Sequence, residues 1–138
     1  MNRIPAKIIS KRSTQKFKED SHYCLLKAKV GTRDFQVLVI EEKGASFSIG
    51  DKGNLLFRED AAFVTLEPPK GFFTNLQKGR LVGIYEKSFW QNLEIEFEGH
   101  SLFFQVLRPD HGLTLQKDAE IYWSVFPHMI IWESLCIT

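Results

Sequence analysis

The chain has 138 residues, of which 43% are hydrophobic, with twelve Phe and three Trp, and its formal net charge is +1. This composition supports a folded core and excludes an intrinsically disordered chain. No apolar run approaches the roughly twenty residues that a membrane-spanning helix needs, and no apolar stretch of a secretory signal follows the basic start. Cys24 and Cys136 stand far apart, which favours a reducing setting over a disulfide scaffold. We expect a cytoplasmic protein without membrane insertion.

The positive charge is concentrated at the start of the chain. Six of the eighteen Lys and Arg residues lie in residues 1–18, which contain no acid, so the rest of the chain holds twelve bases against seventeen acids. Such a stretch can attract phosphate, nucleic acid or an oxyanion. More commonly, such a stretch is a solvated arm without binding specificity of its own.

The chain repeats one pattern over a long distance. Residues 2–8 and 75–81 both begin with Asn and end in a small, a basic and an aliphatic residue. In the first copy Gly31 precedes residues 35–37, and in the second Gly99 precedes residues 104–106, with Phe-Gln-Val in both places. We also align residues 49–57 with residues 115–123. The repeat predicts two copies of one small β module.

In chain order, the hydrophobic pattern predicts strands and turns. The clearest strand is the alternation of Leu93, Ile95 and Phe97 with three Glu residues, because period-two alternation places one face in a core and one in water. Residues 43–50 and 109–116 can each hold one helical turn at most. Pro68 and Pro69 have no backbone N–H to donate to a neighbouring strand, so no central strand can run through them. The predicted strands are residues 3–10, 22–30, 33–40, 54–58 and 62–66, followed by 79–86, 91–98, 101–107, 119–125 and 128–133.

The resulting fold class is all-β, with two small five-stranded β-barrels in tandem. We place the first module at residues 1–66, a linker at 67–74 and the second module at 75–138. Cores of this size are small, and open barrels leave strand edges that invite pairing. We therefore expect the two modules to pack together and the chain to form a homodimer.

The repeated motif, the hairpin with its glycine turn and the later strands resemble the TOBE modules, also called MOP-like or OB-like modules, over nearly the whole chain. One similar group is the regulatory region of ABC-importer ATPases, whose first module ends in a segment like Arg58-Glu59-Asp60 here. The other is the molbindins, which are small oxyanion-binding barrels. The first module begins at Asn2 and the chain contains no phosphate-binding loop motif, which favours a free-standing protein over an ATPase.

The resemblance also implies where an oxyanion would bind. Molbindin-type modules hold it with backbone N–H groups and with side chains of an S-A-R-N and a later K-A-S-S motif. Here the Asn of the first motif is kept, but the Ser and Arg that precede it in molbindins are absent. The later motif aligns with residues 58–61 in the first copy and with residues 124–127 in the second. The carboxylates of Glu59 and Asp60 would repel a dianion. The candidate ligands of molybdate or tungstate are Asn2, Arg3, Lys7, Arg58, Thr74, Asn75, Lys78 and Arg80.

These candidates have simpler explanations too. Lys7 and Arg80 can be outward-facing strand residues, and Arg58 can pair with a neighbouring carboxylate. The four His residues show no metal-binding spacing, and Cys24 is more typical of a core thiol than of a nucleophile. We predict no catalytic residue, no metal and no cofactor.

Three functions follow from these observations. The first is a non-enzymatic oxyanion-binding or regulatory protein, partnered by an ABC-transporter ATPase or regulator. The second is a protein-interaction module whose aromatic-rich second copy, with Phe89 and Trp90, is the contact face. The third is a barrel that binds single-stranded nucleic acid through its basic start. The third is disfavoured, since the bases lie in the first copy and most aromatics in the second.

Overall fold

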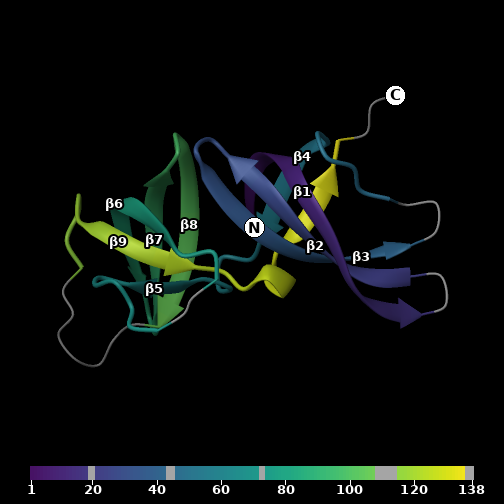
Figure 1. Ribbon diagram of the computed structural model, residues 1–138. Coiled ribbons are helices and arrows are strands. Elements are labelled where there is room, and N and C mark those ends of the chain that lie inside the picture. The colour runs from purple at the N-terminus through teal and green to yellow at the C-terminus, as the bar shows by residue number, and fades with distance from the viewer. Residues whose placement is uncertain (19–20, 43–45, 72–73, 108–114, 136–138) are drawn as a thin grey trace. The chain divides into compact units, whose positions relative to one another are not determined.

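The computed structural model describes residues 1–18, 21–42, 46–71, 74–107 and 115–135, and Figure 1 shows that these are dominated by strands. Of the two segments that could hold one helical turn, residues 46–50 contain none, and most of residues 109–116 lie outside the described part. In chain order the elements are β1 (Asn2–Lys18), β2 (Ser21–Val30), β3 (Arg33–Glu42), β4 (Lys52–Phe57), β5 (Phe63–Thr65), β6 (Gln77–Lys87), β7 (Trp90–Phe97), β8 (His100–Leu107), β9 (Glu120–Ser124), the 3₁₀ helix η1 (Pro127–Met129) and β10 (Ile131–Ser134).

The strands form two curled five-stranded sheets, and the all-β fold class is therefore confirmed. One sheet has the order β5-β9-β6-β7-β8 and the other has the order β10-β4-β1-β2-β3. The chain divides into two compact units around them. Unit 1 comprises Met1–Asn2 and Arg58–Val125, and unit 2 comprises Arg3–Phe57 and the residues from Phe126 onward. None of the described residues belongs to a helix long and apolar enough to cross a membrane.

The fifth strand of each sheet comes from the other repeat. β5 pairs with β9, with Phe63 opposite Ser124, and β10 pairs with β4, with Ile131 opposite Leu56. The two units are therefore discontinuous in sequence and differ from the predicted modules 1–66 and 75–138. The reason is that β5 and β10 are short strands in equivalent places, and local sequence does not state which of two similar edges such a strand joins.

The structure corrects the predicted alignment of the repeats around β4 and β9. In β1, Ile8 exchanges backbone hydrogen bonds with the turn before β4. In β6, Leu81 exchanges them with the turn before β9. These bonds run from Ile8 N to Asp51 O (2.9 Å), from Gly50 N to Ile8 O (2.8 Å), from Leu81 N to Ala119 O (2.9 Å) and from Asp118 N to Leu81 O (2.7 Å). Asp51 thus corresponds to Ala119, whereas the predicted alignment placed it with Lys117, two residues too early.

The hairpin alignment needs a similar correction. The β2–β3 turn has Gly31 at its first position with φ 58°, but the β7–β8 turn has Glu98 first with φ 48° and Gly99 second with φ 77°. The two glycines therefore occupy different turn positions, as type II′ and type I′ hairpins require. Phe35 faces Ala28 and corresponds to Leu102, which faces Ile95; it does not correspond to Phe104.

Each unit has its own apolar core. In unit 1, Trp123 lies 5.1 Å from the ring centres of both Phe97 and Phe104. The predicted inward face of β7 is confirmed, since Leu93 and Ile95 are fully buried and Phe97 nearly so. Unit 2 buries its own set of side chains, which includes Ile4, Ile8, Cys24, Leu26, Ala28, Val30, Phe35, Val37, Leu55, Phe57 and Trp132.

Candidate functional site

Four of the five basic candidate residues form ion pairs with carboxylates. An oxyanion at any of them would compete with a carboxylate that is already in place. The pairs are Arg3–Glu133 (3.2 Å), Arg58–Asp60 (2.9 Å), Lys78–Glu120 (3.6 Å), Arg80–Glu96 (2.7 Å) and Arg80–Asp118 (2.8 Å).

Arg80 has the most acidic surroundings of the four. It lies on β6 between Glu96 on β7 and Glu120 on β9, and its guanidinium also bonds Asp118. The hydrogen bond that Arg80 donates to Glu96 raises the pKa of Arg80 above its ordinary value, with smaller contributions from Asp118. Three carboxylates around one guanidinium leave a negative surface, so this corner of unit 1 disfavours a dianion.

Asn2 and the segment around Arg58 meet in unit 1, along the open edge of β8. The buried Asn2 amide donates to Phe103 O at 2.8 Å and accepts from the Phe103 N–H at 2.8 Å, as a neighbouring strand would. Two residues further along, Gln105 N donates to Glu59 O at 2.8 Å. The two predicted motifs are thus brought together, but their polar groups cover a strand edge. A cavity of about 350 Å³ there is lined by Met1, Arg58, Glu59, Asp60 and Gln105.

Thr74 and Asn75 also serve the fold. Asn75 is buried, has a φ of 61°, and donates from Nδ2 to Val125 O at 2.9 Å. Ser124 Oγ donates to Thr74 O at 2.8 Å. These bonds fix the end of β9 to the chain that leads into β6, and they occupy donors that the resemblance assigned to an anion.

The second copy of the later motif lies elsewhere than predicted. Met129 N donates to Phe126 O at 2.9 Å, which matches the turn in which Ala61 N donates to Arg58 O at 3.1 Å. Residues 126–129, on η1 in unit 2, therefore correspond to residues 58–61, and the predicted 124–127 is two residues early. The only basic residue type in this turn is His128, whose ring stacks on the Phe126 ring.

Lys7 differs from the other basic candidates. It is exposed on β1 of unit 2 and lies opposite Lys29 on β2. Within the described part of the chain, neither lysine forms an ion pair. Lys7 is thus the candidate whose charge remains available to a ligand.

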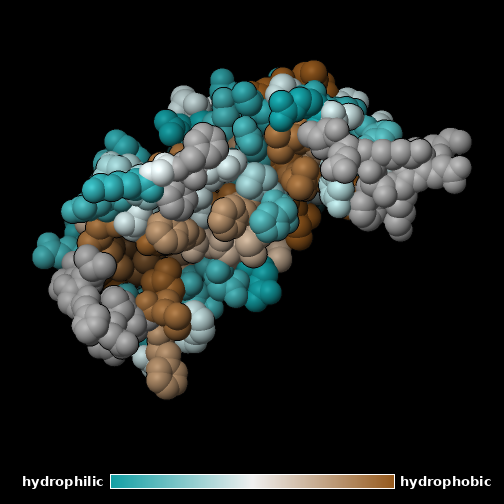
Figure 2. Space-filling model, turned by 60° about the horizontal axis from the view of Figure 1, so that its bottom comes forward, coloured by the Kyte–Doolittle hydropathy of each residue, from teal (hydrophilic) through white to brown (hydrophobic). Residues whose placement is uncertain are grey.

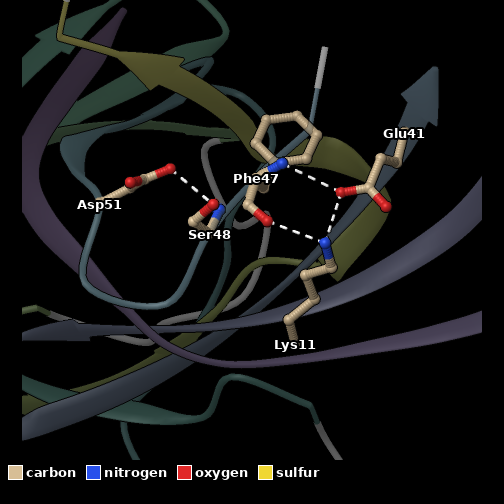
Figure 3. A network of polar contacts seen from close by, with 5 residues as sticks. All are labelled: Lys11, Glu41, Phe47, Ser48 and Asp51. Atoms are coloured by element: carbon tan, nitrogen blue, oxygen red, sulfur yellow. Dashed lines mark hydrogen bonds and ion pairs between the residues drawn. The ribbon is translucent and has the colours of Figure 1, made fainter. Parts of the chain in front are cut away.

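A polar network that sequence reasoning missed holds the loop before β4 (Figure 3). Lys11 Nζ donates to Glu41 Oε2 at 2.6 Å and to Phe47 O at 2.8 Å, and Phe47 N donates to the same Glu41 oxygen at 3.0 Å. Ser48 N donates to Asp51 Oδ2 at 2.9 Å. The Lys11 hydrogen bond lowers the pKa of Glu41, and Glu41 raises the pKa of Lys11. No short motif marks partners that stand so far apart in sequence.

The described residues hold no group of three His, Cys, Asp or Glu side chains arranged for a metal ion. Cys24 is fully buried in unit 2, and burial raises the pKa of its thiol. A protonated, inaccessible thiol is a poor nucleophile. This agrees with the prediction that Cys24 is a core residue.

The topology defines a class of fold, a molbindin-like tandem of two five-stranded β units. Among solved structures, the crystal structure of the cytoplasmic molybdate-binding protein ModG with molybdate bound is similar to this chain, with a TM-score of 0.78. The match covers 97% of this chain and 96% of that chain at 11% sequence identity, so the likeness is one of fold. No protein-family model and no curated protein sequence matches the chain.

Proposed function

We propose that the protein is a non-enzymatic binding protein for a molybdate- or tungstate-type oxyanion. The observation that carries this proposal is the tandem fold, which is similar to that of a molybdate-binding protein over nearly the full length of both chains. A tetrahedral dianion needs several converging donors and nearby positive charge, and exposed strand residues of such units can supply both.

We do not expect the residues of the predicted motifs to supply the positive charge that attracts an oxyanion. The side-chain amides of Asn2 and Asn75 and the main-chain carbonyl of Thr74 form hydrogen bonds within unit 1. The exposed ion pairs of Arg58 and Arg80 are weak because water and salt screen them, but their carboxylates stay nearby when a pair opens. We therefore assign the attraction for an oxyanion to unit 2, where Lys7 is available.

Isothermal titration of the full chain with molybdate, tungstate and sulfate tests the proposal. A ligand present at 100 times its dissociation constant stabilises the folded state by about 2.7 kcal/mol, so a thermal-shift assay should respond as well. We expect heat and a raised melting temperature with at least one of these anions. No heat and no shift with any of them would contradict the proposal.

The proposal extends to a cytoplasmic role in an ABC import system, in which ligand status is passed to a transporter ATPase or a regulator. The resemblance of the repeat to TOBE regulatory regions supports this extension. Co-purification of the ATPase from cells that express a tagged chain tests it, with and without molybdate in the medium. A binding protein that never retains the ATPase would remove the extension and leave oxyanion binding intact.

A second candidate function is protein interaction through unit 1, including formation of a homodimer. Hydrophobic areas reach the surface between hydrophilic ones in Figure 2. Phe89 is 78% exposed, and Trp90, 38% exposed, lies opposite Leu107, which is 67% exposed. Light scattering of the parent and of a Phe89→Ala, Trp90→Ala variant tests this surface. A parent that is monomeric at high concentration excludes the dimer, and an unchanged mass in the variant excludes these residues as its contact.

A further inference from the structure

The corrected register allows the two repeats to be compared position by position. Lys7 and Arg80 hold the same place in the repeated motif, each one residue before the residue that bonds the turn. Arg80 lies opposite Glu96 on one neighbouring strand and opposite Glu120 on the other. In unit 2 the first of these places is taken by Lys29, which lies opposite Lys7.

The second place is taken by Lys52. In unit 1, Leu81 bonds Ala119 and the preceding Arg80 faces the following Glu120. In unit 2, Ile8 bonds Asp51 in the same way. Because residue numbers run in opposite directions along antiparallel strands, the same step places Lys7 opposite Lys52. Lys52, Lys7 and Lys29 therefore form a row across β4, β1 and β2, which we name the lysine row.

The lysine row replaces an acidic cluster by a basic one. The positions of Glu96, Glu120 and Asp118 in unit 1 are Lys29, Lys52 and Gly50 in unit 2. Adjacent strands lie about 4.8 Å apart and side chains opposite one another share a face. All three lysines are exposed, and within the described ranges none has an ion pair. The row ends at Asp34 on β3, opposite Lys29.

Gly50 takes the place in unit 2 that the carboxylate of Asp118 takes in unit 1. Its φ is 97°, and a Cβ there would meet no atom within 4 Å. Asp118 takes the equivalent place with a φ of 71°, so an aspartate is compatible with this turn. The space at residue 50 is open, but a φ of 97° is a conformation that L side chains rarely adopt, so the backbone favours glycine there. The absence of an acid keeps the lysine row positive.

We propose that the lysine row binds a polyvalent tetrahedral oxyanion. This inference rests on the proposed function for its ligand class and adds the place of binding. Like charges directly opposite one another destabilise a sheet, and an anion shared by three ammonium groups, each with three donors, reverses that cost. The loop before β4, held by Lys11 and Glu41, fixes where Lys52 begins its strand.

The test is titration of the full chain with molybdate, sulfate, inorganic phosphate and pyrophosphate, repeated on Lys7→Gln, Lys29→Gln and Lys52→Gln. Lys87→Gln removes the same charge from an exposed position on β6 of unit 1 and is the matched control. We expect each row variant to weaken binding about three- to fivefold, the range of an exposed ion pair. The triple variant should lose binding, while Lys7→Arg should retain it. Circular dichroism checks that every variant is folded.

The outcomes separate this inference from the proposed function. Binding of molybdate that is unchanged in the triple variant overturns the lysine row and leaves the proposed function standing. Binding of phosphate or pyrophosphate that the row variants lose, without binding of molybdate or tungstate, supports the row and contradicts the molybdate-type function. A preference for pyrophosphate over inorganic phosphate supports a row that binds condensed or esterified phosphate. A chain that binds none of the probes overturns the row.

Discussion

Replacing Glu41 by Gln tests the network that holds the loop before β4. The Glu41 side chain is 12% exposed and its partner Lys11 is 27% exposed, so the pair is mostly shielded from water. A hydrogen bond to a charged group contributes about 1.5–3 kcal/mol when buried, and an exposed ion pair about 0–1 kcal/mol. Glu41→Gln keeps the shape but loses the charge, and we expect it to lower the free energy of unfolding by about 1–2 kcal/mol.

The effect of Glu41→Gln should depend on pH. The pKa of Glu41 is lowered from 4.5 in the folded state, so its stabilisation is present above that value and is lost as the pH falls through the lowered pKa. The pKa of Lys11 is raised from 10.5, so its contribution is present below that value and is lost as the pH rises through the raised pKa. The difference between parent and variant should therefore be constant near neutral pH and shrink in acid.

Urea unfolding followed by circular dichroism at pH 7 and at pH 3 measures this difference. Asp60→Asn is the control, because it breaks the exposed Arg58–Asp60 pair and should change stability by less than about 1 kcal/mol. An unchanged unfolding midpoint for Glu41→Gln at pH 7 would refute the reasoning. A difference that persists in full at pH 3 would show that packing, and not the ion pair, accounts for it.

Three further expectations concern packing and reactivity. Gly53→Ala would place a Cβ against the Glu133 carbonyl oxygen and the Trp132 ring, and overpacking should cost about 1–3 kcal/mol; the urea midpoint should fall, and an unchanged midpoint would contradict this close approach. Ile95→Asp puts an unpaired charge into the fully buried core of unit 1, and a soluble, well-folded variant would show that the β7 register is wrong. In a Cys136→Ser background, the buried Cys24 thiol with its raised pKa should react with a thiol reagent only on unfolding, and rapid reaction of the native protein would contradict its burial.

Local patterns located the strands but not all of their bounds, since β1 runs on to Lys18 and the predicted strand 128–133 begins in η1. They were insufficient for the pairing of the strands. The alternation of Leu93, Ile95 and Phe97 predicted an inward face correctly, because side-chain direction follows from the pleat alone. Aligning the two repeats on their turn glycines gave the wrong register, because Gly31 and Gly99 stand at different turn positions and a turn accepts glycine at either one. Hairpin type is decided by both turn residues together.

The candidate site was predictable in part for a related reason. Lys7 belongs to the repeated motif and was found from the sequence. Its neighbours Lys29 and Lys52 come from other strands, and only the register places them beside it. Asn2 and Asn75 were found because the motif keeps them, yet their amides bond backbone groups. A repeated residue marks a place that the fold needs, and the charge difference between the copies marks the place where they diverge.

The exchange of the fifth strands makes a prediction about shortened chains. A fragment of residues 1–66 lacks β10, and a fragment of residues 75–138 lacks β5, so each loses the strand that covers β4 or β9. We expect both fragments to be poorly soluble, because an open apolar edge invites association.

Removing β10 from the full chain is the sharper version of this experiment. A chain that ends at residue 127 loses the buried Trp132 and the bonds of Glu133 to Arg3 and Asn54, while all five strands of unit 1 remain. Deleting a buried aromatic side chain alone costs about 3–5 kcal/mol, so unit 2 should open and unit 1 should persist. Limited proteolysis should then cleave first within residues 3–57. A chain that ends at residue 135 keeps β10 and should resist cleavage like the parent. Equal resistance of both shortened chains would show that β10 does not hold unit 2 together.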